Sequence, residues 1–519
     1  MCRVADSYCK RRLNPAWAWL YDRRSFALQL DNFLENDSLP YFRTRPPMRT
    51  RRIFRNTFYS AAGHGLGDAC GLLFLVIFAR FFGSDVLGEF WFAMATGSIL
   101  GAFVSHGTTR VILRDAARNP PQAAQYIGAA ASVQLLIAAV LLVILAILSG
   151  TIADTTRARS ILLIIGVYQI VYVLASIFRT YFSATEKMQY NALLETSHKV
   201  VILACGVIAL LLIDEPAVVL LIYPLAALGI YIAGYVLVSA HFERPSLHFD
   251  WRLSRNWAIA AFPVFAYGLL TLLANRSGVI ALGQTADAAA VGIFAAGDRL
   301  VSAASLPYIM FTGAVFPIMS KLADSPQELG RFLLTCLRFA AVASVPVTAI
   351  IVLLDDAIVA LVFGQSYQDS GTILGILILS LISIAINSLL SMLYVATNQM
   401  WLLFRIYAIS LVVLFVGIFA TVNTYGPIGL AWSVVASRAS ATAGLLLTAH
   451  RGPLKVPVLK SIVGPITAGL VMGLIYSATI SQPEQLRIIL TLSAGAAALV
   501  VFRGIVPSDV KRIRELVGK

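Results

Sequence analysis

The sequence contains few charged residues for its length. Lysine, arginine, aspartate and glutamate together make up only 13% of the 519 residues, whereas apolar residues make up 59%. Soluble domains of ordinary composition are about one quarter charged. The scarcity of charge excludes a soluble globular protein and indicates a chain that crosses a membrane many times. The net charge of +14 then fits basic loops on the cytoplasmic face of a membrane, and we predict no nucleic-acid partner.

The residues that build metal centres, disulfide frameworks or nucleotide sites are also few or scattered. The five cysteines have neither disulfide nor zinc spacing: they are Cys2, Cys9, Cys70, Cys205 and Cys336. The six histidines are dispersed as well, at His64, His106, His198, His241, His248 and His450. No glycine-rich loop ends in Lys-Ser or Lys-Thr, which excludes an ATPase of that type. No long polar loop could house a catalytic domain, so we predict no metal, no cofactor and no enzymatic activity.

Long apolar runs are what the sequence does contain. Runs of about 20 residues, the length of helix that crosses a bilayer, recur from Phe58 onward. They predict an all-α polytopic membrane protein with about 14 transmembrane helices. We place these helices at residues 57–82, 88–108, 124–149, 160–182, 196–213, 216–240, 257–282, 290–319, 331–354, 370–396, 402–422, 427–449, 459–480 and 486–503.

An internal repeat divides these runs into two halves. Leu87-Gly88-x-Phe90 in the first half and Val291-Gly292-x-Phe294 in the second occupy the same place in two apolar helical hairpins. Internal repeats in a membrane protein are typical of transporters with two lobes around a central site. We predict two pseudo-symmetric six-helix lobes, at residues 56–240 and 256–450, followed by two additional transmembrane helices within residues 458–503.

The two ends of the chain are polar. Residues 1–49 are basic and lack the apolar core of a secretory signal. We interpret the first 47 as a disordered cytoplasmic extension or as a stretch upstream of the start that is used; the alternative is a basic arm on the membrane surface. Residues 504–519 are predicted to be a cytoplasmic tail.

Basic residues concentrate in alternate connections between the predicted helices. One set of connections carries almost all of them, among them Arg110, Arg114, Arg118, Arg179, Lys187, Lys199, Lys321 and Arg331. The other set carries only Arg157, Arg159 and Arg487. Because loops rich in lysine and arginine stay in the cytoplasm, the basic set is predicted to be cytoplasmic. An even number of helices then places both termini there as well.

A few charges lie within the apolar runs, where a charge at mid-bilayer costs at least about 2.5–3.5 kcal/mol and needs a partner or a wet cavity. Asp68 lies in the middle of the first helix, and His64 precedes it by one turn. This spacing places both side chains on one helix face. We predict a pair that couples transport to H+ or Na+; the alternative is a buried hydrogen bond between helices.

Positive charges predominate within the later runs. Arg276 follows Asn275 in the seventh helix, Asp298 and Arg299 lie early in the eighth, and Arg438 lies among small residues. Arginine binds phosphate groups in a bidentate manner. We therefore predict a site for an anionic substrate lined by Asn275, Arg276, Arg299 and Arg438, and a part in ion coupling for Asp298. The alternative for this group is an internal salt bridge between Asp298 and Arg276.

Three stretches together carry a family resemblance. They are Phe78-Ala-Arg80-Phe-Phe-Gly83-Ser-Asp-Val-Leu-Gly88-Glu-Phe90, Ser105-His106-Gly107-Thr-Thr-Arg110-Val-Ile-Leu-Arg114, and Phe316-Pro317-Ile-Met-Ser320-Lys-Leu. In order and spacing they resemble bacterial polysaccharide flippases of the Wzx or O-antigen-transporter type, within the multidrug/oligosaccharidyl-lipid/polysaccharide exporter (MOP) superfamily. The resemblance extends over about residues 50–505.

The resemblance implies a function as well as a fold. It implies alternating access, driven by an ion gradient, that moves a lipid-linked oligosaccharide on a polyprenyl pyrophosphate carrier across the bacterial inner membrane. The implied pathway is the synthesis of a surface polysaccharide, such as lipopolysaccharide or exopolysaccharide. Its implied partners are membrane lipids and the polymerase and export machinery.

Other functions are compatible with the same features. A flippase for a lipid-linked peptidoglycan precursor shares the fold, but its characteristic motifs are not found. A multidrug or cation antiporter of the superfamily usually has twelve helices, and the basic residues do not suit its cationic cargo. A scaffold for a glycan-polymerising complex would not need charges in a transport cavity.

Overall fold

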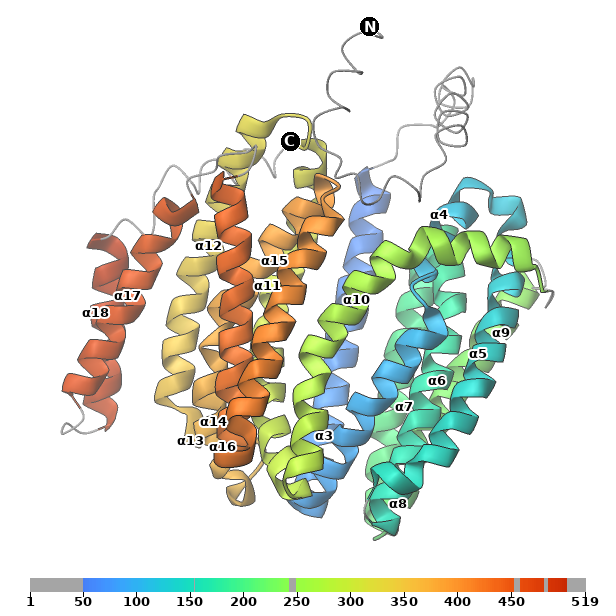
Figure 1. Ribbon diagram of the computed structural model, residues 1–519, viewed down its shortest axis with the longest axis horizontal. Coiled ribbons are helices and arrows are strands. Elements are labelled where there is room, and N and C mark those ends of the chain that lie inside the picture. Colours follow the sequence, from blue (N-terminus) through green and yellow to red (C-terminus); the bar gives the residue numbers. More distant parts are fainter. Residues whose placement is uncertain (1–49, 154, 242–248, 452–457, 480–483, 502–519) are drawn as a thin grey trace, which may run out of the picture. The chain divides into compact units, whose positions relative to one another are not determined.

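The structure is a computed structural model, and it describes residues 50–153, 155–241, 249–451, 458–479 and 484–501. Helices account for nearly all of these residues, and no strand occurs among them (Figure 1). The all-α prediction is thus confirmed. The predicted N-terminal extension, residues 1–49, and the predicted tail, residues 504–519, lie outside the described residues.

The described residues of the first half form seven α-helices: α3 (Thr50–Ser105), α4 (Thr109–Arg118), α5 (Ala123–Ile152), α6 (Thr156–Ala184), α7 (Met188–Leu212), α8 (Pro216–Val219) and α9 (Ile222–His241). A short 3₁₀ turn, Pro120–Gln122, precedes α5. Helix α3 is broken at Gly83, whose φ of 81° lies in the left-handed region that glycine adopts without a steric penalty. The break divides α3 into the two crossing segments that the sequence predicts.

The second half contains α10 (Trp251–Thr285), α11 (Ala288–Lys321), α12 (Pro326–Leu353), α13 (Asp355–Val362), α14 (Asp369–Ile378), α15 (Ser380–Ala396), α16 (Met400–Arg451), α17 (Val458–Ala478) and α18 (Glu484–Val501). Helix α16 is broken at Gly426, with a φ of 54°. If α3 and α16 each count as two passes, and α8–α9 and α14–α15 each count as one, the described helices supply the fourteen predicted passes.

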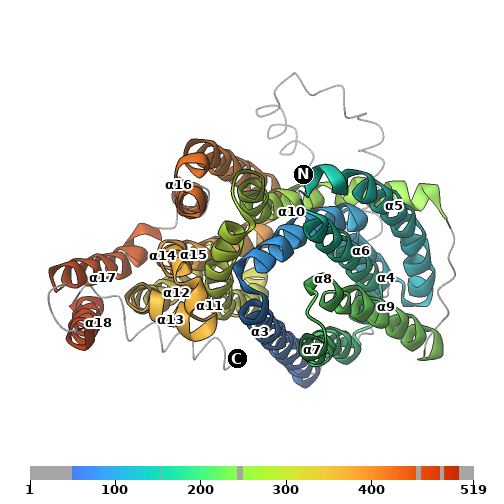
Figure 2. The ribbon, with the colours of Figure 1, turned by 90° about the horizontal axis from the view of Figure 1, so that it is seen from below.

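The contacts between helices fall into two groups. In the first half, α6 packs against α5, α7 and α9; in the second, α16 packs against α10 and α15, and α11 packs against α14 and α15. Figure 2 shows these two groups on opposite sides of α3. Helices α17 and α18 pack against each other and against α12. The exact boundaries of the two lobes stay a prediction.

The surface of the bundle is apolar. Ten helical stretches among the described residues are long and apolar enough to cross a membrane. Large apolar side chains point away from the protein on several of them: Ile147 is 71% exposed, Leu212 78% and Phe419 83%. Extended apolar surfaces of this kind mark contact with lipid, so the chain is a multi-span helical membrane protein.

One end of the bundle carries the break at Gly83, helix α8, the start of α11 and helix α13 (Figure 1, bottom). We call it the outer end, because its connections are those that the charge distribution predicts to face away from the cytoplasm. One of the few basic residues at this end, Arg157, makes two hydrogen bonds of 2.9 Å to the Glu89 carboxylate. Glu89 is buried, so Arg157 neutralises a carboxylate that would otherwise lose its hydration without compensation.

The substitution Arg157→Ala is expected to destabilise the fold, because it leaves the Glu89 carboxylate buried and unpaired. We expect the free energy of unfolding to fall by about 3 kcal/mol, the low end for a broken buried pair, since the Arg157 side chain is itself 44% exposed. The measurement is the melting temperature of the purified protein in detergent. The double variant Arg157→Ala/Glu89→Gln, which removes both charges, should recover most of the loss; a double variant as unstable as the single one would contradict this account.

Candidate functional site

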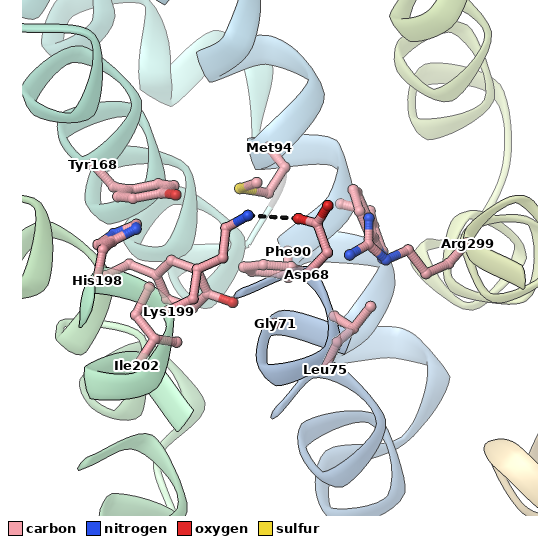
Figure 3. A pocket seen from close by; sticks show the side chains of 12 residues that line it. Asp68, Gly71, Leu75, Phe90, Met94, Tyr168, His198, Lys199, Ile202 and Arg299 are labelled. Carbon is pink, nitrogen blue, oxygen red and sulfur yellow. Dashed lines mark hydrogen bonds and ion pairs between the residues drawn. The ribbon is translucent and has the colours of Figure 1, made fainter. Parts of the chain in front are cut away.

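A cavity of about 210 Å³ lies where α3, α6, α7, α9 and α11 meet (Figure 3). Twelve residues line it: Asp68, Gly71, Leu75, Phe90, Trp91, Met94, Tyr168, His198, Lys199, Ile202, Tyr223 and Arg299. All of them except Arg299 belong to the first half of the chain. Both halves therefore contribute to one cavity, as a site between two lobes requires.

An ion pair crosses this cavity. The Nζ atom of Lys199 on α7 lies 2.5 Å from a carboxylate oxygen of Asp68 on α3, and Figure 3 shows the two side chains pointing toward each other. Lys199 also lies 3.2 Å from Glu195, one turn earlier on α7. One ammonium group thus connects two carboxylates from two helices.

Glu195 belongs to a larger buried network that also includes Tyr172 and Arg179. It is only 4% exposed and accepts hydrogen bonds from the Tyr172 hydroxyl and from the Arg179 guanidinium. Arg179 also lies over the Tyr172 ring, 4.7 Å from its centroid, a cation–π contact. Four charges, two of each sign, therefore balance one another: Asp68, Lys199, Glu195 and Arg179.

Two polar side chains of the cavity wall have no hydrogen-bond partner within the described part of the chain. His198 is 1% exposed and stacks on Tyr172 and Tyr168 at centroid distances of 5.1 and 5.8 Å. Neither of its ring nitrogens has a hydrogen-bond partner among the described residues, and the same holds for the indole N–H of Trp91. Buried polar groups are almost always hydrogen-bonded, so these groups are available to a ligand or to water.

Arg299 approaches the cavity from α11, in the second half of the chain (Figure 3). It makes no ion pair with any residue in the described part of the chain. Since the four charges on the other side balance, Arg299 gives the cavity an excess of positive charge. A cavity with such an excess attracts anions.

Asp298, the residue before Arg299, interacts with a different set of charges. Its carboxylate lies 3.7 Å from Arg438 on α16, and Arg438 also donates a hydrogen bond of 2.7 Å to the Ser380 hydroxyl. Asp298 interacts electrostatically with Arg276 as well, whose buried Nε has no partner among the described residues. Two arginines thus share one aspartate, and this cluster is also positive overall.

Two of the predicted site residues lie apart from these clusters or are not described. Asn275 is exposed and donates a hydrogen bond of 2.7 Å to the Thr271 carbonyl of its own helix. The side chain of His64 lies outside the described side chains, so its predicted pairing with Asp68 stays a prediction. The partner that the structure gives to Asp68 is Lys199.

Lys199 and Arg179 were not predicted as site residues, because both were counted among the basic residues of alternate connections. Both lie within helices, Arg179 in α6 and Lys199 in α7, as the predicted helices at residues 160–182 and 196–213 also place them. A signal was present in the four-residue spacing of Glu195 and Lys199, which places opposite charges on one helix face.

The sequence matches a protein-family model. The family model described as "Polysaccharide biosynthesis protein" matches residues 53–323, slightly more than half of the chain. No curated protein matches the sequence significantly.

Several solved structures resemble the chain in fold. The lipid II flippase MurJ in its inward closed conformation superposes with a TM-score of 0.68 at 15% identity, over 87% of this chain and 99% of that one. An inward-facing multidrug resistance MATE family transporter of the MOP superfamily gives 0.61 at 13% identity, over 76% and 95%. A MOP superfamily transporter from Pyrococcus furiosus gives 0.56 at 14% identity, over 79% and 96%. At such identities the likeness shows the fold alone, which is that of MOP superfamily flippases and transporters.

The substitution Lys199→Met is expected to destabilise the protein, because it leaves Asp68 and Glu195 without their shared ammonium group. We expect a loss of about 3 kcal/mol in the free energy of unfolding, measured as a lower melting temperature in detergent. The variant Lys199→Arg, which keeps the charge, should lose much less, and Lys199→Met/Asp68→Asn should recover part of the loss. Equal melting temperatures for Lys199→Met and Lys199→Arg would contradict the pairing.

Proposed function

Because the chain belongs to the polysaccharide biosynthesis protein family, we propose that it moves a lipid-linked oligosaccharide across the bacterial inner membrane. The observation that carries this proposal is the charge of the cavity between the two halves, where Arg299 is in excess over balanced ion pairs. The cargo carries a pyrophosphate that joins the glycan to its polyprenyl lipid. The protein acts as a flippase and catalyses no chemical step.

The positive groups suit a pyrophosphate in chemistry and in position. Arg299 supplies a guanidinium that can bind two phosphate oxygens at once. The indole N–H of Trp91, which has no hydrogen-bond partner among the described residues, adds a neutral donor to the same cavity wall. In the second cluster, Arg276 and Arg438 exceed the single charge of Asp298. We infer that the headgroup contacts Arg299 first and that Arg276 and Arg438 sustain the positive potential.

The volume of the cavity limits what it can hold. Pockets that enclose drug-sized ligands occupy about 300–1,000 Å³, and this cavity of about 210 Å³ is smaller. It fits the charged headgroup rather than a whole oligosaccharide. On this account the glycan extends beyond the cavity and the lipid tail stays in the bilayer.

The ion pair of Asp68 and Lys199 offers a route to ion coupling. An anionic headgroup that approaches Lys199 competes with Asp68 for the same ammonium group. Once displaced, the Asp68 carboxylate is left without its partner and favours the uptake of H+ or Na+. We propose that Asp68, His64 and Asp298 link cargo binding to the ion gradient in this way.

We also propose an orientation in the membrane and partners on its two sides. Both termini face the cytoplasm, the cargo is loaded there, and the polymerase and export machinery take it up on the other side. The alternative is transport of a cation, which the carboxylates of Asp68 and Glu195 and the fold shared with MATE transporters would favour. The two functions differ in the charge of the cargo and are therefore separable by experiment.

The test of the cargo uses cells that lack this protein. We expect one polyprenyl-linked oligosaccharide to accumulate in the cytoplasmic leaflet, measured by mass spectrometry of lipid-linked glycans sorted by leaflet. If no such lipid accumulates and the cells become sensitive to cationic drugs, the flippase proposal is wrong and the antiporter is favoured.

Site variants connect this activity to the cavity. Arg299→Ala, Arg276→Ala and Arg438→Ala should each lower export at least about tenfold, since each removes a charge-assisted interaction of roughly 1.5–3 kcal/mol. Export is measured in the same leaflet assay at equal amounts of protein in the membrane. The matched control is Arg331→Ala, which removes an exposed arginine of the second half and should export normally. Wild-type export by all three arginine variants would contradict the cationic site.

A further inference from the structure

Two glycines meet at the outer end of the bundle, one from each copy of the internal repeat. A Cβ atom added to Gly88 on α3 would lie 1.8 Å from the carbonyl oxygen of Ala288 on α11. A Cβ atom added to Gly292 on α11 would lie 2.0 Å from the carbonyl oxygen of Ser84 on α3. Neither glycine has a positive φ, so the contact needs glycine for space and not for backbone conformation. The two helix backbones touch without side chains between them.

The contact is reciprocal. Gly88 faces the residue four positions before Gly292, and Gly292 faces the residue four positions before Gly88. A contact in which each partner meets the equivalent residue of the other is the signature of a two-fold axis. The repeat recognised in the sequence is therefore also a contact surface, in which the two copies bind each other.

Two polar side chains repeat the same symmetry. Arg80 stands eight residues before Gly88, and Gln284 stands eight residues before Gly292. Arg80 donates hydrogen bonds to the Leu361 and Val362 carbonyls at the end of α13. Gln284 donates one to the carbonyl of Ile152, the last residue of α5. Each copy of the repeat thus satisfies carbonyls at a helix end in the other half of the chain, groups that have no partner within their own helix.

The side chains around this contact are buried and mostly apolar. The repeat positions Leu87, Phe90, Val291 and Phe294 are all buried, none more than 3% exposed. Tyr367, which is fully buried, donates a hydrogen bond of 3.1 Å to the Ala79 carbonyl across the two halves. Phe90 also lines the central cavity, so the buried apolar side chains around the glycine contact begin at the wall of that cavity.

We propose that Gly88, Gly292, Arg80 and Gln284 form the outer closure of the transporter, a two-fold contact between the repeats that separates when the cavity opens outward. This inference rests on the transport cycle proposed above but not on the identity of the cargo. The backbone contact lets the two helices pack tightly. In the closed state Arg80 and Gln284 donate hydrogen bonds to carbonyl groups at helix ends. Water can donate to the same carbonyl groups when the closure opens.

The test measures access to the cavity from the outer side. In a protein whose native cysteines are replaced, Met94→Cys places a thiol in the cavity wall, and a membrane-impermeant maleimide is added outside. Gly88→Ala and Gly292→Ala should each raise the labelling rate at least about tenfold, since a methyl group at either position forces the helices apart and favours the open state. The matched control is Gly313→Ala, on the same helix as Gly292, where an added Cβ meets no atom within 4 Å.

A second variant distinguishes opening of the closure from misfolding. Arg80→Gln changes one exposed side chain and leaves the glycine contact intact, so it should fold and should raise labelling by a smaller factor. Labelling of Arg80→Gln and of well-folded glycine variants at the rate of Gly313→Ala would overturn the proposal. The readout needs no cargo: a positive result without glycan accumulation in the deletion strain would reject the proposed cargo and keep the closure.

Discussion

A charge within a membrane needs a partner, and this constraint organises the centre of the protein. The cost of an unpaired charge in a medium of low dielectric constant is several kcal/mol. Asp68, Glu195, Lys199 and Arg179 meet that constraint as a connected set drawn from three helices. Asp298 and Arg438 meet it with a longer separation of 3.7 Å. The first set is closely paired, whereas the second leaves positive charge in excess.

The fold could be predicted from the sequence because its signals are local. The length of the apolar runs gives the crossings, and glycine and proline give the breaks, as at Gly83 and Gly426. The pairing of Asp68 could not be predicted, because its partner Lys199 lies 131 residues away on another helix. Spacing along a helix identifies only those neighbours that lie one turn away on the same helix. For this reason the predicted partner of Asp68 was His64. The excess of arginine in the second half could be predicted, since it depends on composition and not on orientation.

The internal repeat, too, could be predicted from the sequence only in part. The similarity of Leu87-Gly88-x-Phe90 and Val291-Gly292-x-Phe294 is visible in the sequence, and it predicts two related hairpins. That the two motifs touch each other is not visible, because the sequence does not record how two hairpins dock. The requirement for glycine becomes clear only when each added Cβ meets a carbonyl oxygen of the other copy.

The helices that form the closure also carry charges of the cavity. Helix α3 holds Asp68 on one side of the Gly83 break and Gly88 on the other, and α11 holds Gly292 seven residues before Arg299. A helix turn repeats every 3.6 residues, so Arg299 lies about two turns from the contact. In the transport cycle proposed above, a headgroup that draws Arg299 therefore pulls on α11, whose backbone makes half of the closure. Helix α11 connects charge in the cavity with opening at the outer end as one continuous helix, whereas on α3 the Gly83 break lies between Asp68 and Gly88.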